Sequence, residues 1–268
     1  MSELAIIDAP SPNFDARDAA PDLVVLHYTG MATGEAALRK LRDPAPTAGA
    51  YRDALPPEYA DLAADAPLGR ASAHYLVEED GRVFRLVAED QRAWHAGVAF
   101  WAGETNVNAR AIGIEIVNGG HDFGLPPYPD AQIEAVIALV ADIQARWSIP
   151  PARVVGHSDV APERKQDPGE RFPWEQLAAT GAALDVTAMG EGRGVRLAAA
   201  GDAAAEVRAA QEALIAAGYG LAASGAMDAR TVAVVAAFQR RVRRGLVDGV
   251  LDAETAALAE TVAARSKP

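Results

Sequence analysis

The sequence predicts an α/β fold with a central, mostly mixed β-sheet flanked by helices, followed by a small C-terminal three-helix domain. Short apolar runs at residues 23–26, 111–117 and 153–155 have the composition of buried strands. Residues 130–147 place apolar side chains at the 3.6-residue period of a helix covering one sheet face. A glycine-rich stretch at 181–201 and a repeat beyond it indicate a second unit, and 268 residues suffice for one large and one small domain.

The chain is acidic, with a formal net charge of −12, which argues against nucleic acid or an anionic membrane surface as a partner. Residues 197–268 hold eight acidic and eight basic side chains, so the excess lies in the first 196 residues, with 29 acidic against 17 basic. There is no cysteine, and so no disulfide framework.

The N-terminus begins with acidic residues and early prolines, where a signal peptide needs a basic start and an apolar core. No stretch approaches transmembrane length without charges. The expected location is therefore the cytoplasm by default, with the periplasm or cell envelope through a non-classical route as the alternative. Nothing in the sequence specifies an oligomeric state.

In chain order, residues 1–20 are expected to form an extended arm, followed by a strand at 22–28. Thr33 is placed to cap a helix that runs to about Arg42 and is ended by Pro44. Residues 43–70 are rich in Pro, Ala and Asp, and a segment of this length is more often a functional wall or mobile excursion than a plain connector. Strands at 74–78 and 82–87 are joined at residues 80–81, an Asp-Gly hairpin signal.

Several rings follow in one loop, at Trp94, His95, Phe100 and Trp101, and they form either a small hydrophobic cluster or part of a binding cleft. The next strand, 111–117, is apolar on both faces except for Glu115. A carboxylate inside such a strand is costly without a partner. Glu115 is therefore either a functional group or one half of a salt bridge.

The helix at 130–147, with Asp130 as its expected cap, ends before two prolines and leads into the strand at 153–155. A loop rich in charged residues and proline, 156–169, begins directly after that strand and contains His157 and Asp167. His27 also ends a strand, so the two histidines come together if both strands lie in one sheet. Two imidazoles and one carboxylate suit zinc and leave a fourth position for water. The alternative is two unrelated strand-end histidines beside a solvated turn.

The C-terminal repeat is carried by Gly225 to Thr231 and, 24 residues later, by Gly249 to Thr255. In each copy a glycine turn precedes an aspartate placed to cap a helix. With a helix near 207–217, this predicts a three-helix module behind a flexible linker. A dimerisation or stability appendage is the alternative to a binding module.

Five motifs occur in the order found in zinc-dependent N-acetylmuramoyl-L-alanine amidases: His27-Tyr28-Thr29-Gly30, Ser72-Ala73-His74-Tyr75, Ala93-Trp94-His95-Ala96-Gly97, Ile112-Gly113-Ile114-Glu115, and Gly156-His157-Ser158-Asp159 through Lys165-Gln166-Asp167-Pro168-Gly169. Over about residues 20–180 the chain resembles this family, most of all its bacterial cell-wall recycling branch of the AmpD and AmiD types. Phage amidases and animal peptidoglycan recognition proteins are more distant relatives.

The resemblance implies one Zn²⁺ per chain, held by His27, His157 and Asp167, with Glu115 and Lys165 as catalytic residues. The reaction it implies is hydrolysis of the amide between N-acetylmuramic acid, or its anhydro form, and L-alanine of the stem peptide. It further suggests four substrate contacts: His74, Trp94, His95 and Asn108. A recognition protein that binds muropeptides without cutting them is the alternative function.

Two departures from the wider family are visible. Ala73 stands where phage relatives often carry a catalytic tyrosine, and no cysteine is present to serve as the third ligand that phage and animal members often use. Asp167 matches the bacterial recycling branch instead.

The C-terminal module resembles the peptidoglycan-binding domain often fused to cell-wall hydrolases, through Val207, Gln211, Leu214, Gly218-Tyr219, Phe238-Gln239 and Asp248-Gly249. The expected organisation is a catalytic domain at 1–181, a linker at 182–201 and this module at 202–268, with peptidoglycan or muropeptide fragments as partners. Its arginines, Arg240, Arg241, Arg243 and Arg244, either meet wall carboxylates or form a solvated charge run, the second being favoured.

Overall fold

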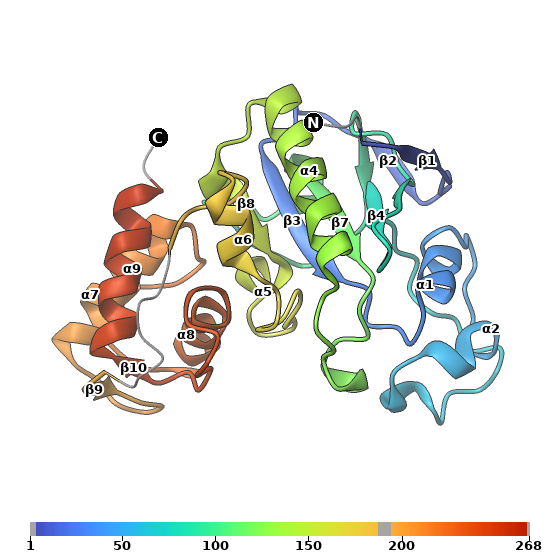
Figure 1. Cartoon of the computed structure of the whole chain (residues 1–268). Coiled ribbons are helices and arrows are strands. Elements are labelled where there is room, and N and C mark those ends of the chain that lie inside the picture. Colours follow the sequence, from blue (N-terminus) through green and yellow to red (C-terminus); the bar gives the residue numbers. More distant parts are fainter. Residues whose placement is uncertain (1–3, 187–193, 267–268) are drawn as a thin grey trace.

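The computed structural model describes residues 4–186 and 194–266, and its centre is a six-stranded sheet in the order β1-β5-β4-β7-β3-β8 (Figure 1). The strands are β1 (Ile6–Asp8), β3 (Leu23–Tyr28), β4 (Tyr75–Val77), β5 (Val83–Arg85), β7 (Ala111–Ile116) and β8 (Val154–Gly156). Neighbours run parallel except β4 and β5, the predicted hairpin, which pair antiparallel. The expected mixed sheet flanked by helices is confirmed.

Strand β3 is central, paired with β7 on one side and β8 on the other. Side chains alternate between the two faces of a strand. Val24 and Leu26 pack in the cluster that contains α4, whereas His27 lies on the opposite face. The register pairs His27 with Glu115 across parallel strands, so both side chains come off the same face.

Helix α4 (Asp130–Trp147) covers one face of the sheet, as its periodicity predicted (Figure 1). Ile133, Val136, Val140 and Ile143 are buried against β3, β4 and β7. The expected cap was wrong, because the N-cap is Pro129 and Asp130 is the first helical residue. In that position the negative charge of Asp130 still interacts favourably with the positive end of the helix dipole. The short helix α6 (Trp174–Ala179) packs in the same cluster.

The opposite face is covered near β4 and β5 by α1 (Gly34–Leu41) and the segment 43–70. The side chain of Thr33 accepts a hydrogen bond from the amide of Ala36, which confirms the predicted cap. The segment folds into α2 (Ala48–Tyr51) and two 3₁₀ turns, η1 (Arg52–Ala54) and η2 (Pro57–Tyr59). Tyr51 and Leu41 pack in one cluster with Leu76, so this segment is anchored to the sheet.

The N-terminal arm joins the sheet system at two places. Strand β1 extends the edge beside β5, and β2 (Phe14–Ala16) pairs antiparallel with β6 (Gln91–Ala93). The remaining short elements are α3 (Val107–Arg110), η3 (His121–Phe123), η4 (Pro151–Arg153) and α5 (His157–Val160).

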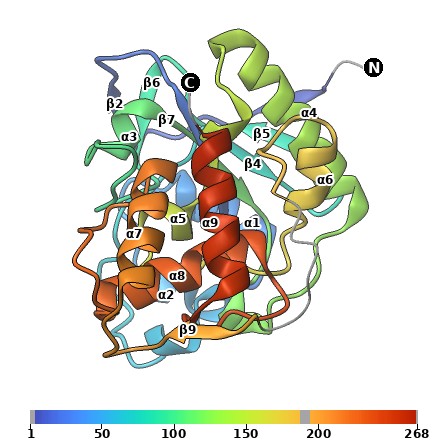
Figure 2. The ribbon, with the colours of Figure 1, turned by 90° about the vertical axis from the view of Figure 1, so that its left-hand side faces the viewer.

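The C-terminal module consists of α7 (Ala205–Ala217), α8 (Ala229–Val242) and α9 (Ala253–Arg265), with a small ribbon of β9 (Arg196–Ala198) and β10 (Leu251–Asp252). Both predicted caps are present, since Asp228 accepts from the amide of Thr231 and Asp252 from that of Thr255. In Figures 1 and 2 helix α8 lies beside α5, close to the sheet edge at β8.

The module shares a hydrophobic cluster with the sheet domain, in which Val155 and Val160 lie with Val234 and Phe238 of α8. The predicted linker at 182–201 lies partly outside the described residues, at 187–193. In its described parts Ala182 and Ala183 are buried and β9 is paired with β10.

The four C-terminal arginines contact acidic groups within this chain, so the expected solvated charge run was wrong. Arg241 and Arg243 are buried. In the order Arg240, Arg241, Arg243 and Arg244, the paired carboxylates are those of Glu170, Asp159, Asp252 and Glu175. Three of these pairs, those with Glu170, Asp159 and Glu175, join the module to the preceding domain. In the described part of the chain, no helix combines the length and apolar character needed to cross a bilayer.

Candidate functional site

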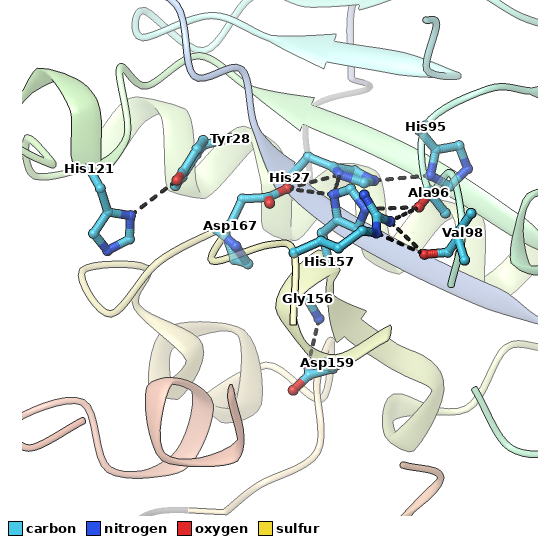
Figure 3. Close-up of polar contacts among 12 residues, drawn as sticks. His27, Tyr28, His95, Ala96, Val98, His121, Gly156, His157, Asp159 and Asp167 are labelled. Carbon is cyan, nitrogen blue, oxygen red and sulfur yellow. Dashed lines mark hydrogen bonds and ion pairs between the residues drawn. The ribbon is translucent and has the colours of Figure 1, made fainter. Parts of the chain in front are cut away.

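Three donor groups from distant parts of the chain converge at the carboxyl ends of β3 and β8 (Figure 3). His27 is in β3, His157 opens α5 directly after β8, and Asp167 lies in the following loop. The Nδ1 atoms of the histidines are 2.9 Å apart, and each lies 3.0 Å from Oδ2 of Asp167. All three side chains are buried. The carbonyl of Asp167 also accepts from the amide of Ser158 at 2.9 Å, which ties the loop to α5.

The outer ring nitrogens fix how the two imidazoles face this cluster. Nε2 of His157 donates to the carbonyl of Ala96 at 3.1 Å, so Nδ1 on the other side of the ring faces the centre of the cluster. Nε2 of His27 lies 3.0 Å from Nδ1 of His95, which is placed to accept its proton. Two Nδ1 atoms on rings that are each held by an outer contact, together with one carboxylate, form a donor set that fits a divalent cation.

The surroundings of His27 and Asp167 set the charge of each side chain. Burial, followed by the neighbouring His157, lowers the pKa of His27 to about 4, so this ring is neutral at pH 7. Burial by itself would raise the pKa of Asp167, but its contacts with His157 and His27 outweigh this and hold the pKa far below its usual range. The His27 ring is therefore neutral and Asp167 is a carboxylate, the ionisation states that metal ligands need.

The cluster opens into a cavity of about 580 Å³ whose lining includes Glu115, Lys165 and Lys40. Oε2 of Glu115 is buried and has no hydrogen-bond partner among the described residues. Burial and then the charge of Asp167 raise the pKa of Glu115 to about 8, against the opposing charges of Lys165 and Lys40. A buried, unpaired carboxylate facing a cavity is a candidate for proton transfer rather than for structural support.

The predicted substrate contacts fall in different places. His95 lines the cavity, whereas His74, Trp94 and Asn108 are not part of its lining. Oδ1 of Asn108 accepts from the amides of His95 and Ala96, so it holds the loop that supports the cluster. Trp94 lies under the guanidinium of Arg70, 5.1 Å from the ring centre. Of the two neighbouring rings in this loop, His95 therefore lines the cavity and Trp94 packs outside it.

Trp101 belongs to neither the cavity nor a separate aromatic cluster of this loop. It is buried against Tyr219 of the C-terminal module, with ring centres 5.0 Å apart. The hydrophobic-cluster interpretation is therefore the right one for Trp101, although its partners come from the second unit.

The segment 43–70 supplies a wall of the cavity through Leu55, Pro56, Glu58 and Tyr59. Its expected role as a functional wall is thus matched by its position. Sequence reasoning missed Lys40, which enters the cavity from α1, and Tyr28, whose hydroxyl lies 3.1 Å from Nδ1 of His121 (Figure 3). Neither residue was assigned a role from the sequence, although Tyr28 stands in the first motif, because each became part of the site only through tertiary packing.

His74 is buried beside His95, with ring centres 5.8 Å apart, and does not line the cavity. Its Nδ1 accepts from the amide of Gly113 at 2.9 Å, and Nε2 lies 3.1 Å from the carbonyl of Gln91. Nη2 of Arg17, from the N-terminal arm, is 2.9 Å from the same Nε2. Burial and the charge of Arg17 lower the pKa of His74 to about 3, so the ring stays neutral in the folded chain.

Acidification from pH 7 to pH 5 is therefore expected to destabilise the metal-free protein through His74. The unfolded chain binds a proton there near pH 6.5 and the folded chain only near pH 3, so stability is present above pH 6.5 and is lost as pH falls, by ~1 kcal/mol per pH unit. Urea unfolding with a chelator present checks this. His74→Asn should be less stable at pH 7 but should lose about 2 kcal/mol less on acidification. Equal losses in the two proteins would contradict the assignment.

A mixed sheet with a buried His-His-Asp cluster beside an unpaired carboxylate defines an α/β protein with the site of a metal-dependent hydrolase. The more particular result comes from comparison with known proteins. The family model for N-acetylmuramoyl-L-alanine amidase matches residues 17–170, and that for a putative peptidoglycan binding domain matches residues 203–258. The chain belongs to the N-acetylmuramoyl-L-alanine amidase family.

Individual relatives agree with this assignment. The N-acetylmuramoyl-L-alanine amidase AmiD of Escherichia coli K12 is 39% identical over 207 residues, which are 72% of this chain and 74% of the relative. A structure of AmiD from E. coli with the substrate anhydro-N-acetylmuramic acid-L-Ala-D-gamma-Glu-L-Lys superposes with a TM-score of 0.71, 32% identity, and 94% and 92% coverage of this chain and that one. AmpDh3 from Pseudomonas aeruginosa in complex with anhydromuramic pentapeptide gives a TM-score of 0.65, 32% identity and 90% coverage of each chain.

Proposed function

We propose that this chain hydrolyses the amide bond between N-acetylmuramic acid, or its anhydro form, and L-alanine of the peptidoglycan stem peptide. One Zn²⁺ per chain would be held by His27, His157 and Asp167. The observation that carries the proposal is the convergence of these three donors beside Glu115 in one cavity, in a chain of this amidase family.

The donor set favours zinc over a harder cation. Magnesium and calcium prefer oxygen ligands, whereas two imidazole nitrogens and one carboxylate are a common zinc set with a position left for water. When bound, zinc supplies a Lewis acid for the scissile carbonyl and lowers the pKa of a water molecule.

Glu115 is the proposed proton carrier. It comes off the same sheet face as His27, and it takes the proton of the attacking water and delivers it to the leaving amine nitrogen. In the metal-free chain its pKa of about 8 reflects burial and the charge of Asp167. Neutralising Asp167 with a bound cation removes the second cause and favours the carboxylate form needed to accept a proton.

Lys165 is the proposed stabiliser of the oxygen that becomes negative as water adds to the carbonyl. It lines the cavity two residues before Asp167, and its ammonium makes no hydrogen bond or ion pair with another described residue. Its ammonium is therefore available to the substrate, and a fixed positive charge at a developing oxyanion lowers the barrier.

The division into a catalytic domain at 1–181, a linker at 182–201 and a peptidoglycan-binding module at 202–268 is part of this proposal. The match of residues 203–258 to a putative peptidoglycan binding domain supports the last assignment. Two relatives with bound anhydromuramyl peptides support a muropeptide substrate. A lytic enzyme acting on whole sacculi is the variant of this function that the module favours.

Metal content measured together with release of free stem peptide tests the proposal. The full-length protein is expected to hold one zinc and to release stem peptide from anhydro-muropeptides, and the rate on intact sacculi distinguishes recycling from lysis. Stoichiometric metal without any release of peptide would instead support the alternative, a muropeptide recognition protein.

His95 is expected to matter for metal affinity, because its Nδ1 is the acceptor that orients His27. Replacing it with phenylalanine keeps a flat ring but removes the acceptor, and zinc should bind about 10-fold to 100-fold more weakly. Competition with a chromophoric chelator measures this, and His95→Gln, which retains an acceptor, should lie between wild type and His95→Phe. Unchanged affinity in both variants would show that His95 does not support the ligand.

A further inference from the structure

Asp159 is a buried carboxylate two residues after the proposed ligand His157, and three donors satisfy it. Its Oδ2 accepts from the amide of Gly156 at 2.8 Å, and its Oδ1 accepts from the hydroxyl of Tyr219 at 2.5 Å. Nη1 of Arg241 lies 3.4 Å from Oδ2. Figure 3 shows Asp159 directed away from the metal ligands, towards Gly156.

Two of the three donors come from the C-terminal module. Tyr219 follows α7 and is 2% exposed, packed edge-on against Trp101 and Phe238. Arg241, in α8, also donates to the carbonyl of Val154 at 3.0 Å. The module thus contacts β8 and α5, the two elements on either side of the junction at which His157 stands.

The module also approaches the preceding domain closely at Gly218. The amide of Ala102 donates to the carbonyl of Gly218 at 2.8 Å. Gly218 has φ +121°, and a Cβ there would lie 2.7 Å from the Trp101 ring. Only glycine fits both the backbone conformation and the space, so Tyr219 enters the interface at a fixed position.

The hydrogen bond from the amide of Gly156 to the carboxylate of Asp159 bridges the backbone of His157. Gly156 directly precedes His157, and Asp159 follows it by two residues. A buried carboxylate that loses partners either stays unsatisfied at high cost or turns towards water. In the second case Asp159 releases the amide of Gly156, and the backbone that holds His157 loses its restraint.

We propose that the C-terminal module holds the metal-ligand loop in place through Asp159, with Tyr219 as a positioning residue for His157. This role is separate from binding the cell wall, and it rests on the proposed metal site. The module is then a structural part of the catalytic centre, and its position relative to α5 sets the affinity of the site for metal.

The test uses the full-length chain and measures zinc affinity by chelator competition, the absorption spectrum of the Co²⁺-substituted protein, and thermal unfolding of the metal-free form. Tyr219→Phe keeps the buried ring and removes only the hydroxyl. It is expected to weaken zinc binding about 10-fold, the lower end of the range for outer contacts of metal ligands, and to change the Co²⁺ spectrum.

Two matched controls separate this effect from general loosening. Tyr75→Phe removes another buried tyrosine hydroxyl, which donates to the carboxylate of Glu89 at 2.8 Å. Tyr75 packs in the cluster on the α4 face of the sheet, opposite the face from which His27 comes. Arg230→Gln breaks the ion pair with Glu163, which joins the module to the loop, and a hydrogen bond to the carbonyl of Gly220, while the Tyr219 hydroxyl and Asp159 are kept. Both are expected to keep the affinity and Co²⁺ spectrum of the wild type.

A double-mutant cycle with Asp159→Asn decides whether Tyr219 acts through Asp159. The combined variant is expected to match Asp159→Asn alone, because the contact is already lost. Independent effects of the two changes, or a Tyr219→Phe protein that binds zinc like its controls, would overturn the inference and leave the proposed function standing. A wild-type chain without stoichiometric metal would overturn both. If Asp159→Asn does not fold, Tyr219→Phe against its two controls still gives the answer.

Discussion

Replacing Asp167 with alanine is expected to remove stoichiometric zinc and to lower muropeptide turnover by at least about 10³-fold, or ~4 kcal/mol of transition-state stabilisation. The carboxylate is the only anionic member of the His27, His157 and Asp167 cluster, and its Oδ2 touches both imidazoles at 3.0 Å. Without it two neutral rings remain, and a divalent cation loses both a ligand and the charge that compensates its desolvation. Metal analysis after dialysis, together with release of free stem peptide, measures both effects.

Asp122→Ala is the matched control for that experiment. Asp122 is an exposed carboxylate in the lining of the same cavity, outside the three-donor cluster. Its loss should leave the zinc content unchanged. An Asp167→Ala protein that retains a full equivalent of zinc after dialysis would refute the assignment of Asp167 as a ligand.

Replacing Glu115 with glutamine is expected to lower turnover by about 10²-fold to 10⁴-fold while zinc remains bound. The side-chain amide of the introduced glutamine has the size of the carboxylate but cannot accept a proton from water. A Glu115→Ala variant should show the same separation between lost turnover and retained metal. Lost turnover with retained zinc distinguishes a proton carrier from a metal ligand, because loss of a metal ligand would also remove the zinc.

Stability supplies an independent check on Glu115. Its folded-state pKa of about 8 exceeds the ordinary value of 4.5, so the folded chain holds a proton that the unfolded chain releases between those two pH values. Stability therefore falls as pH rises through this window, and the metal-free Glu115→Gln protein should be at least as stable as wild type at pH 7. A large loss of stability would mean that reduced turnover reports misfolding.

Glu58→Gln is the corresponding control, because Glu58 lies in the wall formed by residues 43–70 and is exposed. Its effect on turnover should be small beside that of Glu115→Gln. Comparable losses of turnover in Glu58→Gln and Glu115→Gln would contradict the role of Glu115 as the proton carrier.

Much of the fold followed from local patterns. The strand at 22–28, the hairpin at Asp80-Gly81 and the helix capped by Thr33 each depend on neighbouring residues, and the structure confirms them. The cap of α4 was misplaced by one residue, because Pro129 adopts the extended conformation that precedes the helix and no side chain makes the capping bond. Local chemistry identifies such a boundary only approximately.

The site residues that lie in recognisable sequence motifs were predictable from the sequence. The sequence nominated His27, His157, Asp167 and Glu115, and the structure places all four around one cavity. Of the four expected substrate contacts, His74, Trp94 and Asn108 do not line the cavity. Those residues adjoin motif residues in sequence, but adjacency along a chain does not determine which face a side chain meets.

The C-terminal arginines show the same limit more clearly. A run of four arginines is usually solvated, yet Arg241 is buried on Asp159 and Trp174. A charge is buried only when partners from elsewhere in the chain satisfy it, and those partners are 82 residues away for the pair with Asp159. No local pattern carries that information.

The sequence by itself determined the central strands, the caps of α1, α8 and α9, the order of the motifs and the chemical types of the donor groups, because each depends on residues close together along the chain. Only the tertiary structure decided that His27 and His157 direct their Nδ1 atoms at one Oδ2, that Glu115 remains unpaired, and that Tyr219 reaches the loop of His157. Those arrangements arise from packing between segments up to 140 residues apart, where the burial of polar groups permits few geometries.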